Sequence, residues 1–208
     1  MRVHLLALAF AIVMAGTAHA QPGTVFIEGS GGAMIPVGDF HHLQNLGGAY
    51  SLAAGYEVID FVDLTLEFTH SFNDNDNAHF TGVGFREESD ETNQTFVVDA
   101  GPRINFLPAH YLVRPYALFQ VGWYHFANFN DVRFEGANLV SPEDDDAVGI
   151  EAGLGLEGTV FQLFERQSDD LPLLDIALGV HGSYHQAFFP GRPDRQFVTT
   201  MGSVTVRF

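Results

Sequence analysis

The stretch VDLTLEFTHSF, residues 62–72, decides the fold, because apolar and polar side chains alternate along it. One face carries Val62, Leu64, Leu66, Phe68 and Phe72, and the other carries Asp63, Thr65, Glu67, Thr69 and Ser71. Only His70 interrupts the apolar face. Successive side chains of a strand point to opposite faces of a sheet, so a period of two predicts a β-strand with one apolar side and one polar side.

The same alternation returns along the rest of the chain. It is regular in Phe96–Phe106, Val148–Val160, Leu174–Tyr184 and Phe197–Phe208, and less regular in Thr24–Pro36, Gly48–Glu57 and Arg114–Phe126. Together with residues 62–72, these segments predict eight strands. Each is long enough to cross a bilayer, for which a tilted strand needs about 9–11 residues.

The connections between these segments alternate in length. The short ones are Val58–Asp60, Leu107–Val113 and Leu163–Pro172, and the long or acidic ones are Val37–Gly47, Asn73–Gln94, Ala127–Asp146 and Ala187–Arg195. Such an order is typical of an up-and-down meander with all the long loops at one end.

The nature of the two faces indicates which side meets lipid. The apolar face is continuous and carries many aromatic side chains, whereas the other face mixes charged residues with Gly, Ala, Ser and Thr. The aromatic residues are Tyr50, Tyr56, Phe68, Phe72, Phe96, Phe106, Trp123, Tyr184 and Phe208. The predicted fold class is therefore all-β, an eight-stranded antiparallel up-and-down transmembrane β-barrel. The alternative is a secreted lipocalin-like barrel with the two faces reversed.

Composition and charge agree with a membrane barrel and exclude other classes. The 208 residues are 46% hydrophobic and only 17% charged, against roughly 25% charged in an ordinary soluble domain. The net charge of −17, with Arg as the only basic side chain apart from His, excludes nucleic-acid binding. The lack of Cys excludes disulfides, thiolate metal sites and a cysteine nucleophile.

The first twenty residues have the features of a secretory signal peptide. Arg2 is followed by an apolar run from Leu5 to Ala15, and Ala18-His19-Ala20 forms an A-x-A cleavage pattern. We therefore expect residues 1–20 to be removed and residues 21–208 to form one barrel domain in the bacterial outer membrane. No later stretch is long and apolar enough for a transmembrane helix.

Three segments resemble the outer-membrane protein β-barrel domain family, the small eight-stranded barrels of the OmpA and OmpX type. They are Gly29–Phe40 with its Pro36-x-Gly38-Asp39-Phe40 exit, Arg114-Pro115-Tyr116, and the terminal Val204-Thr205-Val206-Arg207-Phe208. The resemblance implies contact with outer-membrane lipid and lipopolysaccharide. It also implies recognition of Phe208 by the barrel assembly machinery. Because the sequence ends at the last predicted strand, we expect no peptidoglycan-binding domain to follow, unlike in the larger members.

The inward phase of the strands predicts a polar network inside the barrel. Its members are Glu28, Glu57, Asp63, Glu67, Asp99, Arg103, Arg114, Glu151, Glu157, Asp175, His181 and Arg207. Eight carboxylates cannot all pair with three Arg, so water, bound cations or protonated carboxyls must complete the interior. We expect a polar plug. The alternative is a narrow cation-preferring channel lined by Glu67, Asp99, Glu151 and Glu157.

No catalytic, cofactor or metal site is predicted. His181 and Ser183 share a strand face and resemble the His-x-Ser of outer-membrane lipid A deacylases, but the period points both inward and Tyr184 replaces that family's Asn. His41, His42 and His79 lie in predicted loops with acids nearby and could hold a transition metal, but adjacent His rarely chelate together on an extended chain. The acidic runs of the loops are more simply solvated tips. We therefore expect a non-enzymatic barrel with a structural or surface-interaction role. Weak divalent-cation bridging from the acidic loops to lipopolysaccharide is a further hypothesis, and a lipid-modifying enzyme is the least favoured alternative.

Overall fold

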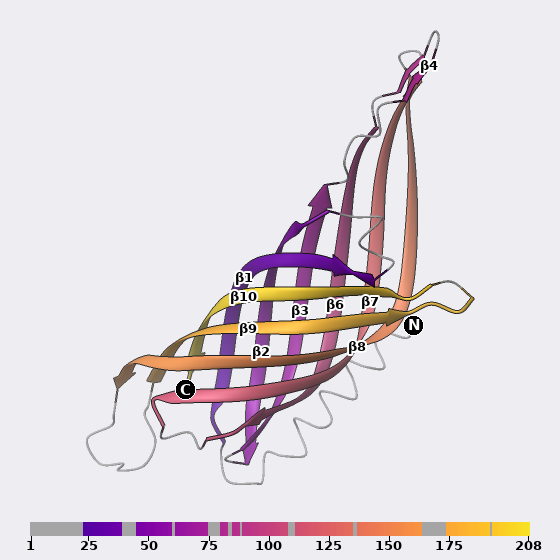
Figure 1. Ribbon diagram of the computed structural model, residues 1–208. Coiled ribbons are helices and arrows are strands. Elements are labelled where there is room, and N and C mark those ends of the chain that lie inside the picture. The colour runs from indigo at the N-terminus through magenta and orange to yellow at the C-terminus, as the bar shows by residue number, and fades with distance from the viewer. Residues whose placement is uncertain are drawn as a thin grey trace.

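The computed structural model shows a closed β-barrel of eight antiparallel strands (Figure 1). It describes residues 23–38, 45–59, 61–74, 80–82, 85–87, 89–107, 111–134, 137–163, 174–191 and 193–208. The predicted signal peptide and the loop residues His41, His42 and His79 lie outside these ranges. The barrel strands are β1 (Val25–Val37), β2 (Gly47–Ile59), β3 (Val62–Asp74), β6 (Ser89–Asn105), β7 (Val113–Phe134), β8 (Ala137–Leu163), β9 (Leu174–Phe188) and β10 (Arg195–Arg207). The predicted eight-stranded antiparallel barrel is confirmed.

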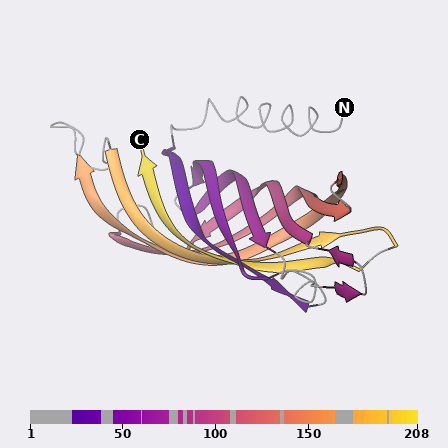
Figure 2. The same cartoon turned by 90° about the horizontal axis from the view of Figure 1, so that it is seen from above.

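Pairing between the first and last strands closes the sheet. Strands β1 and β10 run antiparallel from Phe26 opposite Arg207 to Val37 opposite Gln196, and Figure 2 shows them side by side. Val25 and Phe208 then exchange two backbone hydrogen bonds of 3.0 Å. Each of the eight strands therefore has two neighbours, and the barrel has no open edge.

The two faces differ as the alternation predicted. Large apolar side chains such as Leu52, Val121, Leu154 and Val180 point outward and are about 60% exposed. Charged and polar side chains point inward and are buried. The polar face is thus the inside of the barrel, which excludes the reversed arrangement of a lipocalin-like barrel.

The prediction of a loop is wrong for two of the long connections, because both contain β-structure. Asn73–Gln94 holds a small separate hairpin, β4 (Phe80–Gly82) with β5 (Phe85–Glu87), and the first residues of β6. Ala127–Asp146 is almost entirely a hairpin, since β7 and β8 stay paired from Ala127 opposite Asp144 to Phe134 opposite Ala137. In Figure 1 these two strands rise well above β1, β9 and β10.

The acidic composition of this segment concealed its backbone pairing. The run Glu143–Asp146 favours a solvated loop tip. Antiparallel pairing, however, satisfies the backbone N–H and C=O groups whatever side chains point into water. A hairpin that leaves the barrel in register continues for as long as its two strands face each other, and β6 accompanies it as far as Ser89 opposite Val132.

No helix among the described residues is long and apolar enough to cross a membrane.

Candidate functional site in the barrel interior

The structure places the predicted polar network inside the barrel. Eleven of its twelve members are buried, with at most 9% of the residue exposed. They are Glu28, Asp63, Glu67, Asp99, Arg103, Arg114, Glu151, Glu157, Asp175, His181 and Arg207. Glu57 is half-buried near the end of β2 that is joined to β3 by the short turn. We call this the short-turn end of the barrel and the opposite one the long-loop end.

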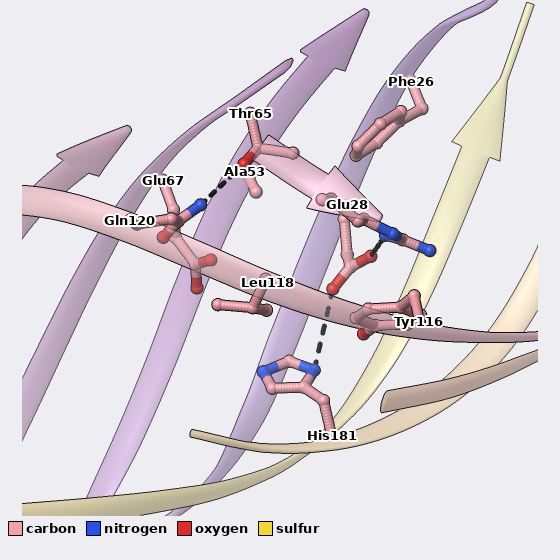
Figure 3. Close-up of a pocket in the computed structure, with 10 residues that line it drawn as sticks. Phe26, Glu28, Ala53, Thr65, Glu67, Tyr116, Leu118, Gln120 and His181 are labelled. Atoms are coloured by element: carbon pink, nitrogen blue, oxygen red, sulfur yellow. Dashed lines mark hydrogen bonds and ion pairs between the residues drawn. The ribbon is translucent and has the colours of Figure 1, made fainter. Parts of the chain in front are cut away.

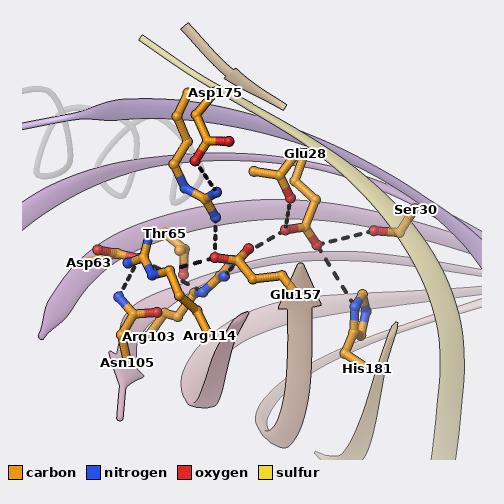
Figure 4. Close-up of polar contacts among 12 residues, drawn as sticks. Glu28, Ser30, Asp63, Thr65, Arg103, Asn105, Arg114, Glu157, Asp175 and His181 are labelled. Carbon is orange, nitrogen blue, oxygen red and sulfur yellow. Dashed lines mark hydrogen bonds and ion pairs between the residues drawn. The ribbon is translucent and has the colours of Figure 1, made fainter. Parts of the chain in front are cut away.

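Arg103 is the centre of an ion-pair cluster near the short-turn end (Figure 4). Its guanidinium nitrogens lie 2.6 Å from a Glu157 oxygen, 3.2 Å from Glu28 and 3.8 Å from Asp63. Its guanidinium carbon also lies 3.7 Å from the centre of the Tyr116 ring. A planar guanidinium can bind carboxylates along its edge while an aromatic ring covers its face, which Lys cannot do.

Glu157 is shared by all three interior arginines. Besides Arg103, it contacts Arg114 at 3.6 Å and Arg207 at closer range, and Arg207 continues to Asp175 at 3.5 Å. Three cations thus meet Glu28, Asp63, Glu157 and Asp175, so the cluster is close to neutral. Because a buried charge is tolerated only when it is paired and hydrogen-bonded, this neutrality is what allows the cluster to lie inside the barrel.

A small cavity adjoins the arginine cluster (Figure 3). Its volume is about 20 Å³, which is room for one water molecule. Glu28 lines it and accepts hydrogen bonds from Thr205 at 2.9 Å on one oxygen and from Ser30 at 3.3 Å on the other, and His181 Nδ1 lies 3.8 Å from the oxygen that accepts from Ser30. On the far wall Gln120 donates to Thr65 at 2.6 Å.

A second group of carboxyls lies farther from the short-turn end. Glu67 and Asp99 are directly opposite each other on β3 and β6. Glu151 on β8 interacts electrostatically with Asp99, His181 and His185, and its oxygen is 3.8 Å from His185 Nε2. The ligand atoms of Asp99, Glu151 and His185 lie within 4.8 Å of one another, so these three residues could hold a metal ion.

An apolar layer separates these polar groups from the long-loop end. Its buried members are Met34, Ala49, Val97, Tyr124, Phe126, Ala147, Ala187, Phe197 and Met201. They come from β1, β2, β6, β7, β8, β9 and β10, while β3 places the buried hydroxyl of Ser71 opposite Ala49. Beyond it, Arg195 lies 4.5 Å from the Phe126 ring centre and pairs with Asp145 at 2.8 Å.

This layer is not among the features predicted from the sequence, although the sequence contains a signal for it. Large apolar side chains occupy inward positions of the alternation at Val97, Phe126 and Phe197. A uniformly polar interior would have polar or small residues at these positions. All three lie near the ends of the predicted strand segments Phe96–Phe106, Arg114–Phe126 and Phe197–Phe208 that lead to the long connections. Apolar residues at inward positions near one end of several strands are the pattern that predicts an internal apolar layer.

The four carboxylates of the predicted channel do not lie together. Glu157 belongs to the arginine cluster, whereas Glu67, Asp99 and Glu151 form the second group. His181 and Ser183 are both buried inside the barrel, and His181 faces Glu28.

Comparison with known proteins identifies the fold. No protein-family model matches the sequence, and no curated protein matches it. Among solved structures, the attachment invasion locus protein Ail of Yersinia pestis, in complex with the heparin analogue sucrose octasulfate, is similar with a TM-score of 0.53 and 16% identity over 90% of this chain and 100% of that one. Neisserial surface protein A is similar with a TM-score of 0.50 and 14% identity over 89% of this chain and 97% of that one. The chain therefore has the fold of the small eight-stranded outer-membrane barrels, as the resemblance in its sequence predicted.

Proposed function

We propose that this chain is an integral outer-membrane β-barrel protein that does not conduct and that presents an acidic surface at its long-loop end. The observation that carries the proposal is the contrast between the two faces of one closed sheet. The outer face is apolar, and the inner face is filled by a nearly neutral ion-pair cluster and a transverse apolar layer. Bilayer physics requires closed backbone pairing and an apolar exterior, and both are present.

The outer face also carries a row of rings that suits the membrane interface. Tyr50, His70, Phe96 and His125 are successive partners across β2, β3, β6 and β7. His70 stacks on Phe96 with ring centres 4.4 Å apart, and His125 Nδ1 lies 2.9 Å from an Asp146 oxygen. Aromatic and imidazole rings combine an apolar body with a polar edge, so this row favours contact with lipid and lipopolysaccharide head groups.

The interior supports a plug rather than a channel. A cation path through the barrel has to pass both the arginine cluster, whose paired side chains fill the interior, and the apolar layer, which excludes the hydration shell of a cation. The cavity between the walls has room for one water molecule. Eight strands enclose little space beyond their own side chains.

The long connections give the outer end its acidic character. Residues 73–94 hold six acidic side chains and one Arg, and residues 127–146 again hold six and one, so each segment sums to −5. Such charge attracts cationic partners or divalent cations that bridge to anionic lipopolysaccharide. The same negative charge repels a polysulfated sugar of the kind bound by Ail, so the proposal includes no such ligand for this chain.

The proposal includes no enzymatic role. The residues with the best sequence case for one, His181 and Ser183, are buried inside the barrel rather than exposed to lipid. A hydroxyl nucleophile there has no route to a lipid acyl chain.

Expression in a double-membrane bacterium tests the proposal. We would insert an epitope tag at residues 135–136, between β7 and β8, and tag the short connection 164–173 in a second variant. The proposal predicts that both proteins fractionate with the outer membrane and that only the first tag is labelled on intact cells. Recovery in the periplasm, or labelling of the second tag on intact cells, contradicts it.

A further inference from the structure

Three ligand-type side chains meet inside the barrel from three strands. Asp99 comes from β6, Glu151 from β8 and His185 from β9, and they are 2%, 4% and 1% exposed. Each offers one ligand atom, and the three atoms lie within 4.8 Å of one another. The spacing is near that of ligands around one metal ion, since bonds of about 2.0–2.2 Å to zinc place two opposed ligand atoms at most about 4.4 Å apart.

The lack of a side chain at one position of the intervening strand allows these residues to approach one another. Strand β7 lies between β6 and β8, and its inward residue opposite Asp99 is Gly122. A Cβ atom at Gly122 would lie only 2.5 Å from Asp99 Cβ. Gly122 is itself opposite Gly149 on β8, so two bare positions clear the space over which Asp99 and Glu151 meet.

The hydrogen bonds of His185 fix which ring nitrogen faces the carboxyls. Tyr124 Oη lies 3.2 Å from the Ile150 carbonyl oxygen, which can only accept, so the phenol proton points there. The phenol oxygen then accepts from His185 Nδ1–H at 3.3 Å. Nε2 is left with its lone pair, 3.1 Å from the Thr199 hydroxyl and 3.8 Å from a Glu151 oxygen. A hydrogen bond that fixes the far ring nitrogen is the usual second partner of a metal-binding histidine.

The two carboxyls need a cation between them. Asp99 and Glu151 lie within side-chain hydrogen-bond range, and two carboxylates can share that position only through a proton or a metal ion. The cations of the arginine cluster already pair with Glu28, Asp63, Glu157 and Asp175. Glu67, opposite Asp99, places a third carboxyl beside the pair.

Ser183 lies on the same inward face of β9 as His185 and is 1% exposed. Its hydroxyl interacts with the carboxyl of Glu151. It lies against the bare backbone of Gly153, two residues from Glu151 on β8. Ser183 is therefore a buried polar neighbour of the three residues.

We propose that Asp99, Glu151 and His185 bind a divalent transition-metal ion inside the barrel. One imidazole and two carboxylates are donors that zinc accepts, with a water molecule in the fourth position. The ion replaces the Thr199 hydroxyl proton at His185 Nε2 and joins β6, β8 and β9 across β7. This inference goes beyond the proposed function and does not depend on what the long-loop end contacts.

Zinc content of the refolded mature chain tests the site. The protein, residues 21–208, is refolded in detergent with Zn²⁺, stripped of loosely held metal on a chelating resin, and analysed by mass spectrometry for zinc. We expect one zinc per chain in the wild type and in His181→Gln, a matched control for a buried histidine outside the three ligands. We expect loss of that zinc in His185→Gln and Asp99→Asn. Folding of each variant is checked by its heat-dependent gel shift.

Either of two results overturns the inference. A folded wild type that retains no more zinc than His185→Gln shows that a proton holds the carboxyl pair. Zinc that persists in both variants lies on other residues. If neither variant folds, cobalt(II) in the wild type decides. Strong visible absorption that EDTA removes only after unfolding supports the site, and weak absorption or immediate loss to EDTA contradicts it.

Discussion

Glu157 is the carboxylate on which the interior arginines depend, because Arg103, Arg114 and Arg207 all contact it. We predict that Glu157→Gln lowers the free energy of unfolding by about 3–5 kcal/mol, since Arg114 loses the carboxylate that it contacts and its buried charge is left uncompensated. The measurement is urea unfolding in detergent micelles. Glu57→Gln is the matched control, because Glu57 is only half-buried at the barrel end and its loss of charge is compensated by water. Equal losses in the two variants would show that the cluster contributes nothing specific.

Gly122 is predicted to tolerate no side chain. A Cβ there would lie 2.5 Å from Asp99 Cβ and 2.7 Å from the Val98 carbonyl oxygen. We expect Gly122→Ala to cost about 1–3 kcal/mol, the usual range for overpacking. Gly31→Ala is the control, since a Cβ at Gly31 meets nothing within 4 Å. The same unfolding experiment measures both variants. An unchanged free energy of unfolding in Gly122→Ala would contradict the close approach of the Asp99 side chain to the backbone of Gly122.

The sequence predicted which side chains point inward, but not which of them pair. Inward phase follows from a period of two, which is read along one strand. Pairing depends on the height that each residue reaches after eight strands have been set in register. Glu151 and Glu157 are six residues apart on the same face of β8. Glu157 contacts three arginines, whereas Glu151 interacts with Asp99 and His185. No local pattern carries that information.

At the scale of elements, the hairpin formed by the outer parts of β7 and β8 stands apart from the barrel wall. Its residues from Ala127 to Asp146 pair with each other, and on one side with β6. We predict that replacing residues 131–140 by Asn-Gly leaves the barrel intact, because every residue removed lies beyond the apolar layer. A gel shift between boiled and unboiled samples checks this. A truncated chain that never shows the folded band would mean that the hairpin is needed for closure.

The strands themselves could be predicted and the hairpin could not, for one physical reason. A strand in the barrel wall has an apolar and a polar side, so its pattern reports its environment. In residues 127–146 the apolar and polar alternation fades in the sequence, and the acidic run 143–146 has the composition of a loop. The β4–β5 hairpin was missed in the same way.

At the scale of the whole molecule, the outward face predicts how charge is tolerated along the membrane normal. Leu154 and Ile59 are similarly exposed, at 66% and 60%, but Leu154 lies within the wall and Ile59 ends β2. In a lipid bilayer we expect Leu154→Arg to lower the free energy of unfolding by about 2–4 kcal/mol and Ile59→Arg to lower it by at most about 1 kcal/mol. These are the usual costs of a lipid-facing arginine at the bilayer midplane and at the interface. Unfolding from lipid vesicles measures both costs. Equal costs would contradict a bilayer centred on the barrel wall.

The central claim is that the barrel spans a bilayer with its interior closed, and ion conductance across a planar lipid bilayer tests it most directly. The mature chain is first shown to insert by its gel shift in lipid vesicles and is then added to the bilayer. The arginine cluster and the apolar layer predict insertion without conductance steps. Stable, cation-selective steps from the inserted wild type would contradict the closed interior and favour the channel.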